Sequence, residues 1–493
     1  MYEAKFQKYL TKNVARFAEP EEICESLVPF KNEDGVFAAG VPLFYKDKTL
    51  YVDNSDAHTM VIGPTGCKKS RVTVFSTVSS AIEAGESAII NDPKGEIFRK
   101  TAARAKEKGM DVYLLNFRNP SKSFYWNPLR QALKFSLSGN EDESLQCIND
   151  FAHTVVAPAI EKTNDRYWGD TSEAFLSALA LVLMESTSEE YFNLTNLIQL
   201  CYEENYSKLK TLLSRMDQTS VAAFGLHTVL DLQAEKTKSC IYSTLLSVLS
   251  PFVKNKNLLR MLSDSSFEIE DICKKPTLVY IIYPDEKNSL NFLVNLFLTQ
   301  CYETFVSYAH RCVGDRLPVR VNFILDEFSN LTKIDNFSNR ISEARSKNIR
   351  YFLFIQSFGQ LKQKYGDNAE AIISNCNNWI CFSSKEMEFL EKISKICGQE
   401  LDYNGIEHSL VSPFQMQYLR KCNEFSEVLV IKQGIHPYVA ELPDFDYVDN
   451  FRDYKEMNLL DIDVYSKARF FSFDEWRMGI RTGEFRYPFP SAA

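Results

Sequence analysis

The sequence lacks the features that mark metal sites, disulfide scaffolds and membrane spans. None of its six histidines falls at metal-ligand spacing, so we expect no structural zinc site. Its twelve cysteines include no C-x-x-C pair, which favours reduced thiols in a cytosol over a disulfide framework. The longest apolar run covers residues 174–184 and is shorter than the ~20 residues that cross a bilayer. We therefore expect a cytoplasmic protein without a transmembrane helix.

The sequence also lacks an excess of positive charge. Its 56 basic and 65 acidic side chains give a formal net charge of −9, which excludes a globally basic nucleic-acid coat or a polybasic membrane binder. The acidic excess is concentrated in residues 141–250, which hold 16 acidic and 7 basic side chains, while the rest of the chain is balanced. This block indicates either an inserted domain with its own partner or a solvated helical surface that has none.

The 493 residues, with 45% apolar content, are enough for several folded domains. Short apolar runs without strict alternation are typical of strands buried on both faces of a parallel sheet. Helical stretches separate most of these runs, which is the pattern of a doubly wound α/β domain. The predicted strands cover residues 49–52, 59–62, 87–90, 112–116, 277–283, 321–325, 351–355 and 427–431.

Strand patterns disappear between residue 140 and about residue 276, where helical patterns cover 172–184, 206–215 and 238–252. An all-α domain at 141–264 therefore interrupts an α/β domain at 49–140 and 265–452. Residues 1–48 form an N-terminal segment that opens with a basic amphipathic helix, which either packs on its own domain or meets a membrane surface or membrane partner. Residues 453–493 form an aromatic-rich tail that we expect to pack on the body.

A phosphate-binding loop is predicted at residues 63–70, where a strand runs into GPTGCKKS and a helical segment follows. Backbone N–H groups of such a loop surround the β-phosphate, a lysine reaches the β- and γ-phosphates, and a hydroxyl binds magnesium. Lys69 and Ser70 fit the last two roles. Lys68 occupies the position where this motif has a glycine, so its side chain either crowds the nucleotide or forces another loop conformation. The predicted nucleotide-binding residues are Gly63, Pro64, Thr65, Gly66, Cys67, Lys68, Lys69 and Ser70.

Two further strands end in polar residues that suit the same chemistry. The strand at 321–325 ends in Asp326 and Glu327, a Walker B pattern in which Asp326 holds magnesium and Glu327 accepts a proton from the attacking water. The strand at 351–355 ends in Gln356, our candidate for sensing the γ-phosphate or orienting water. The alternative for Gln356 is that it only caps the next helix.

Together these segments resemble the coupling proteins of type IV secretion, the TraG/TraD family of conjugative DNA-transfer ATPases. The order and spacing of the matching elements span residues from about 58 to 442. The matching text is GPTGCKKS at 63–70, IINDPKGEIFRKTA at 89–102, NPL at 127–129, YWGDTSEAFLSAL at 167–179, KTKS at 236–239, PTLVYIIYPDE at 276–286, FILDEFSNLTKI at 323–334, and EARSKNIRYFLFIQSFGQLKQKYGD at 343–367.

The resemblance implies a RecA-like P-loop NTPase domain with a mainly parallel twisted sheet, interrupted by the all-α domain. It implies a homo-hexamer around single-stranded DNA, with ATP and Mg²⁺ held between subunits; a monomer is the alternative for the isolated chain. On this basis Asp92, Lys94 and Glu96 line the nucleotide edge of the sheet. Arg345, with Arg350 and Lys347 as alternatives, is the candidate arginine finger that reaches a neighbouring subunit.

The same resemblance assigns partners. The acidic all-α domain would recognise a relaxase or accessory mobilisation proteins, and an acidic surface suits a basic DNA-processing partner. A membrane-anchored secretion-channel protein would recruit the chain to the inner face of the cell membrane. Relatives of this family mostly begin with transmembrane helices, and this sequence begins with the amphipathic stretch instead, so we expect a separate protein to supply the anchor.

Three functions remain open at this point. The first is an ATP-dependent coupling protein that delivers relaxase-bound single-stranded DNA to the channel. The second is a non-hydrolysing, nucleotide-dependent docking adaptor, which the Lys68 departure favours. The third is a double-stranded-DNA translocase or defence ATPase of the same fold, because fold alone does not separate these activities.

Overall fold

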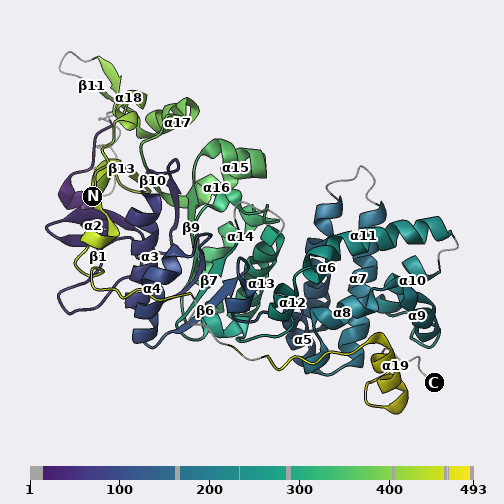
Figure 1. Ribbon diagram of the computed structural model, residues 1–493. Helices are drawn as coiled ribbons and strands as arrows, with labels where there is room; N and C mark the ends of the chain where they lie inside the picture. The colour runs from purple at the N-terminus through teal and green to yellow at the C-terminus, as the bar shows by residue number, and fades with distance from the viewer. Residues whose placement is uncertain are drawn as a thin grey trace. The chain divides into compact units, whose positions relative to one another are not determined.

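The computed structural model describes residues 15–488 except 161–166, 232–233, 285–289, 402–405, 460–463 and 465. The described chain forms two compact units (Figure 1). The first unit comprises residues 1–113, 271–282 and 305–459, and the second comprises 114–270, 283–304 and 460–493. The predicted amphipathic helix lies almost wholly in residues 1–14, outside the described residues.

A nine-stranded sheet forms the centre of the α/β fold, in the order β14-β13-β10-β4-β9-β8-β5-β7-β6. The strands from β10 to β7 in this order pair in parallel, whereas β10–β13 and β13–β14 pair antiparallel. This confirms the predicted α/β class with a mainly parallel sheet. The strands are β4 (His58–Ile62), β5 (Ser87–Asn91), β6 (Asp111–Asn116), β7 (Thr277–Ile282), β8 (Val321–Leu325), β9 (Ile349–Ile355), β10 (Cys376–Cys381), β13 (Phe425–Lys432) and β14 (Tyr438–Pro443).

The five strands β4, β5, β7, β8 and β9 are buried at every residue, as expected for apolar runs covered on both faces. The prediction placed residues 49–52 in this sheet, and that placement is wrong. They form β3 (Thr49–Val52), the middle strand of a separate sheet with β1 (Val28–Pro29) and β2 (Pro42–Lys46). Its partners in that sheet pair antiparallel, and alternate residues of β3 are less buried, so it packs only one face on the core.

Connections on the two sides of β4 run in opposite directions along the sheet. The chain passes from β4 through α3 (Phe75–Ala84) toward β5, and from β9 through α15 (Phe358–Tyr365) and α16 (Asn368–Asn375) toward β10. Because parallel crossovers are right-handed, these helices cover opposite faces. The carboxyl end of β4 is therefore a topological switch point, the place where open α/β sheets bind ligands.

The remaining elements of the first unit flank this frame. They are α2 (Pro20–Ser26), α4 (Glu96–Glu107), α14 (Phe337–Ala344), α17 (Met387–Cys397), α18 (Pro413–Gln417), and a hairpin of β11 (Gln399–Leu401) and β12 (Glu407–Ser409).

Helices make up the second unit around α7 (Tyr167–Ser186), which is buried on most of its surface. Gly225 lets α10 approach α7 closely, because a Cβ there would lie 2.7 Å from both the carbonyl oxygen of Ala174 and the Cβ of Ala178. The other helices are α5 (Arg130–Leu137), α6 (Glu141–Ile160), α8 (Leu194–Leu200), α9 (Tyr206–Leu213), α10 (Val221–Leu230), α11 (Glu235–Val253), α12 (Lys256–Met261), the first part of α13 (Asn291–Ala309) and α19 (Phe473–Thr482).

The aromatic tail packs within this second unit. Trp476 on α19 is 1% exposed, and its indole N–H donates to the Ser186 hydroxyl at 3.0 Å. Phe471, Phe473 and Phe485 are also buried. No helix among the described residues is long and apolar enough to cross a bilayer.

Candidate nucleotide site

Four adjacent strands bring the predicted site residues to one edge of the sheet. The loop at 63–70 follows β4, Gln356 follows β9, Asp326 and Glu327 follow β8, and Asp92 follows β5. The register pairs Ile62 with Ile355 and Asn91 with Leu325. The residues that directly follow these strands therefore lie side by side, as a ligand site at the carboxyl edge requires.

The loop requires glycine at its first position. A Cβ on Gly63 would lie 2.6 Å from the Cys67 sulfur and 2.9 Å from the Phe382 Cβ. The loop then turns through Gly66, whose φ of +80° favours glycine. Lys68 also has a positive φ, +69°, so the backbone keeps the conformation for which the motif uses glycine. The expectation that Lys68 forces another loop conformation is therefore wrong.

The Lys68 side chain turns toward the end of β14. Its ammonium donates to the Asn423 carbonyl at 3.0 Å and pairs with Asp444 at 3.2 Å. Arg71 Nε donates to the same carboxylate at 3.1 Å. Burial acts to raise the pKa of Asp444, yet the hydrogen bonds from Arg71 and Lys68 hold that pKa below its usual value.

Lys69 is a buried cation without a carboxylate partner. Its side chain is 5% exposed overall, and its ammonium donates to the carbonyls of Gly63 (3.3 Å) and Ile355 (3.1 Å). Among the described residues it makes no ion pair. A buried ammonium that makes no direct ion pair is costly, so this arrangement suits an anionic ligand at the loop.

Ser70, at the end of the loop, contacts Asp326, which follows β8 two strands away from β4 in the sheet. The Ser70 hydroxyl donates to Asp326 Oδ2 at 3.2 Å, and the Asn91 amide donates to the Asp326 carbonyl at 2.5 Å. Burial raises the pKa of Asp326 to about 6, although the Lys69 charge acts to lower it. A hydroxyl and a carboxylate oxygen in contact are the hard oxygen donors that Mg²⁺ prefers, so these two residues fit a magnesium ion.

Glu327 and Gln356 form the outer part of the site. Gln356 Nε2 donates to Glu327 Oε2 at 2.9 Å, and Glu327 Oε1 accepts no hydrogen bond from the described residues. The helix-cap alternative for Gln356 is wrong, because Ser357 caps α15 and accepts from the Gln360 N–H at 3.3 Å. Glu327 itself has a φ of +53°, an uncommon conformation for glutamate that occurs at functional sites.

Asp92 lies beside this group but is fully buried. Its Oδ2 accepts the Phe98 N–H at 2.8 Å, so it holds the start of α4. Burial raises the pKa of Asp92 to about 7, since hydrogen bonds from the α4 backbone only partly offset it. Lys94 and Glu96 follow in the same turn with exposed side chains.

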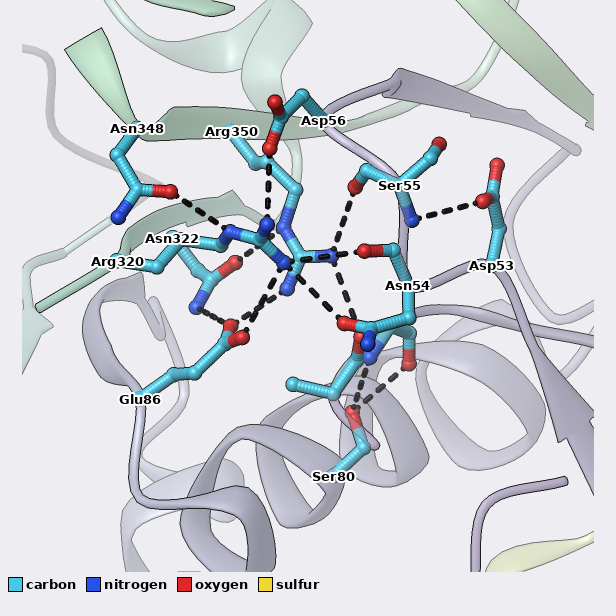
Figure 2. Close-up of polar contacts among 12 residues, drawn as sticks. Asp53, Asn54, Ser55, Asp56, Ser80, Glu86, Arg320, Asn322, Asn348 and Arg350 are labelled. Atoms are coloured by element: carbon cyan, nitrogen blue, oxygen red, sulfur yellow. Dashed lines mark hydrogen bonds and ion pairs between the residues drawn. The ribbon is translucent and has the colours of Figure 1, made fainter. Parts of the chain in front are cut away.

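The candidate arginines lie at the opposite edge of the sheet. Arg345 is exposed just before the amino end of β9, so it is remote from the site of its own chain. Arg350 is 1% exposed and pairs with Glu86 at 2.6 Å, while its Nε donates to Asn322 (Figure 2). Because Arg350 is buried, the prediction that it serves as an arginine finger toward another subunit is wrong.

Figure 2 shows that Arg350 belongs to a network that joins the amino ends of neighbouring strands. Arg320 pairs with Asp56 at 2.9 Å and with Glu86 at 3.3 Å, and Asn348 accepts from Arg320 at 3.0 Å. The network therefore fixes the amino edge of the sheet and leaves the carboxyl edge for the ligand.

Sequence reasoning missed a basic segment that borders the loop. Lys421 donates to the Gly66 carbonyl at 2.6 Å, although 355 residues separate the two. A cavity of about 260 Å³ lies here, lined by residues 64–67 on one side and by Leu419, Arg420 and Lys421 on the other. The adjacent basic residues Arg420 and Lys421 were the only indication in the sequence, and they do not indicate which segment they contact.

Comparisons with known proteins agree with this geometry. Residues 11–405 match the family described as type IV secretory system conjugative DNA transfer. The conjugal transfer protein TraG of Escherichia coli is 25% identical over an alignment of 397 residues, with 74% of this chain and 58% of TraG covered. A second TraG of Escherichia coli is 25% identical over an alignment of 372 residues, with 70% of this chain and 55% of that protein covered. The chain thus spans less than two thirds of the curated relatives it matches.

Solved structures show the same fold. The plasmid coupling protein TrwB in complex with ADPNP has a TM-score of 0.60 at 16% identity, with 92% of this chain and 95% of TrwB covered. TrwB with ADP and Mg²⁺ has a TM-score of 0.62 at 16% identity, with 91% and 97% covered. VirB4 of Thermoanaerobacter pseudethanolicus has a TM-score of 0.52 at 13% identity, with 82% and 96% covered. With a family match over most of its length and this shared fold, the chain belongs to the type IV secretory system conjugative DNA-transfer family.

Proposed function

We propose that this chain is an ATP-dependent coupling protein of conjugative type IV secretion, which recruits a relaxase–DNA complex and drives single-stranded DNA toward the membrane channel. The observation that carries the proposal is the buried, unpaired Lys69 beside the Ser70–Asp326 contact, in a chain of the conjugative DNA-transfer family. TrwB, which shares the fold, has been solved with ADPNP and with ADP and Mg²⁺.

Nucleotide binding follows from the loop. The ammonium of Lys69 exchanges its two carbonyl acceptors for phosphate oxygens, which gives the buried cation a counter-charge. Ser70 and Asp326 would hold Mg²⁺, which would neutralise charge on the phosphates when bound. Lys68 leaves the phosphate cradle open, because its amine is held at Asp444.

Proton transfer falls to Glu327. Gln356 occupies Oε2 and so orients the carboxylate, while Oε1 is left to accept a proton from the attacking water. Water then adds to the γ-phosphorus and the bond to the bridging oxygen breaks, which releases ADP and phosphate. Arg345 completes the site from a neighbouring subunit of a homo-hexamer, because its position before β9 keeps it away from its own loop.

The partners follow from the family. We propose that the acidic all-α domain at 141–264 recognises the relaxase or mobilisation proteins, and that a membrane-anchored channel protein brings the assembly to the inner face of the membrane. The acidic block at 141–250 supports a basic partner surface.

The test is steady-state ATP hydrolysis by the purified chain, with and without single-stranded DNA. We expect DNA-stimulated turnover that falls at least 100-fold in Lys69→Ala and in Glu327→Gln, with nucleotide affinity lost only in the first. Lys106→Ala, an exposed lysine on α4, is the matched control. Turnover that survives both site variants would refute the assignment of the site.

The docking adaptor remains the second candidate, because Lys68 and Lys421 tie the loop to the end of β14 and to the segment at 419–427. Nucleotide binding without turnover would favour it. Stimulation by duplex DNA alone would favour a double-stranded-DNA translocase.

A further inference from the structure

The second unit contains a basic, aromatic cavity of about 350 Å³ between α9 and α19. Its volume falls within the range of sites that bind small molecules and side-chain clusters. Four cations line it: Lys208 on α9, Arg215 just after α9, and Arg477 and Arg481 on α19. Two of these four cations lie within the acidic block at residues 141–250, and the two on α19 lie outside it.

Internal carboxylates leave most of this positive charge uncompensated. Asp474 pairs with Lys208 at 3.0 Å and with Arg477 at 3.4 Å. Arg215 and Arg481 are exposed and make no ion pair within the described part of the chain. One carboxylate therefore pairs with only two of the four cations, and the cavity is electrostatically suited to an anion.

The floor of the cavity is apolar. Phe473 and Trp476 are buried, and Ile480 and Leu212 lie beside them. The polar atoms of the aromatic rings are already used: the Trp476 N–H donates to Ser186, and the Tyr487 hydroxyl donates to the Leu212 carbonyl at 2.7 Å. A ligand in the cavity would therefore contact apolar side chains and aromatic ring edges, together with guanidinium groups.

We propose that this cavity, independently of nucleotide, binds an acidic protein segment in which carboxylates flank an apolar or aromatic side chain. The guanidinium groups would bind the carboxylates in charge-assisted pairs, and the apolar side chain would enter the cavity. The segment would come from a transfer-system protein of mixed charge, whose basic parts meet the acidic surface of the same unit.

Nucleic acid fits this cavity less well. Single strands bind by stacking bases on exposed aromatic faces, but Phe473 is 6% exposed and Trp476 is 1% exposed. A short acidic peptide presents its charge only to the four cations.

The experiment measures fluorescence anisotropy of a labelled peptide, Gly-Glu-Asp-Phe-Glu-Asp-Gly, with the full chain at low salt and without nucleotide. We expect binding that weakens at least tenfold in Arg215→Glu/Arg481→Glu. A peptide with Gln and Asn in place of the acids, or with Ala in place of Phe, should also bind at least tenfold more weakly. The matched control is Lys254→Glu/Lys256→Glu, which reverses the same number of exposed charges outside the cavity.

Thermal unfolding checks that the variants are folded. If the Arg215→Glu/Arg481→Glu variant is unfolded, Arg215→Gln/Arg481→Gln takes its place. No peptide binding to the wild-type chain, or equal binding to both double variants, would overturn the proposal. Tighter binding of oligo-dT that is lost only in the Arg215/Arg481 variant would assign the cavity to nucleic acid instead. Because no nucleotide is present, failure here is distinct from failure of the ATPase assignment.

Discussion

Replacing Lys68 with glycine tests whether the loop already has the conformation that the motif needs. Lys68 has a φ of +69°, which costs a non-glycine residue about 1–2 kcal/mol. Its ammonium gains an ion pair with Asp444, in which the Lys68 side chain is 23% exposed, so the pair contributes about 0–1 kcal/mol. Glycine removes both effects and adds about 0.5–1 kcal/mol of backbone entropy cost.

These opposing effects nearly cancel, so Lys68→Gly should change the free energy of unfolding by less than about 1 kcal/mol. Lys68→Ala loses the ion pair and keeps the positive φ, so it should be less stable than Lys68→Gly by about 1 kcal/mol. The order is opposite to the one found at an ordinary helical position, where alanine is better than glycine. Asp444 stays compensated in both variants, because Arg71 still binds it.

Urea denaturation of the three chains measures this order, and titration with a fluorescent ATP analogue measures affinity. We expect nucleotide affinity and turnover of Lys68→Gly to stay within about threefold of wild type, since the native side chain already points away from the phosphate cradle. An increase in turnover of tenfold or more would show that Lys68 crowds the nucleotide. Equal stability of the alanine and glycine variants would show that the positive φ carries no cost.

Three further predictions follow from the same geometry. The folded chain holds Asp92 at a pKa of about 7 against about 3.9 in unfolded chains, so unfolding releases a proton between pH 4 and 7 and stability falls as pH rises through that window. Asp92→Asn should flatten this fall in thermal unfolding, and an unchanged pH profile would contradict the raised pKa. Arg350→Met should cost about 3–5 kcal/mol in urea, because Glu86 and Asn322 lose a buried partner; a cost below about 1 kcal/mol would make the network in Figure 2 dispensable. Arg345→Ala should leave nucleotide binding unchanged and lower turnover at least tenfold, and mixing it with Lys69→Ala should restore part of the activity.

The site could be predicted where its information is local in the sequence. A buried apolar strand followed by a polar residue locates Asp326 and Gln356 at one edge, because parallel strands share their carboxyl edge. The loop at 63–70 is also a local pattern. Its conformation at Lys68 was not predictable, because the residue type alone gives no sign of a positive φ.

Other parts depend on contacts between distant residues. Strand β10 carries Asn377 and Asn378 in its middle, so its hydropathy does not indicate a strand, yet it pairs with β4 in the sheet. The β3 segment has the composition of a central strand, and only its antiparallel partners show that it belongs elsewhere. The ties from Lys421 and Asp444 to the loop span more than 350 residues, a distance at which no periodic pattern applies.

Under the proposed function, the two ends of β9 have different roles. Its carboxyl end places Gln356 against Glu327, inside the site of its own chain. Its amino end follows the exposed Arg345, and seven residues of strand separate the two ends by about 20 Å. A guanidinium that extends about 7 Å from its Cα does not cross that distance, so Arg345 does not reach the site of its own chain. The buried Arg350 network fixes this end of the strand, which would hold the arginine in a constant position relative to a neighbour. Under the proposed function we therefore expect hydrolysis to require assembly, so that a monomer binds nucleotide without turning it over.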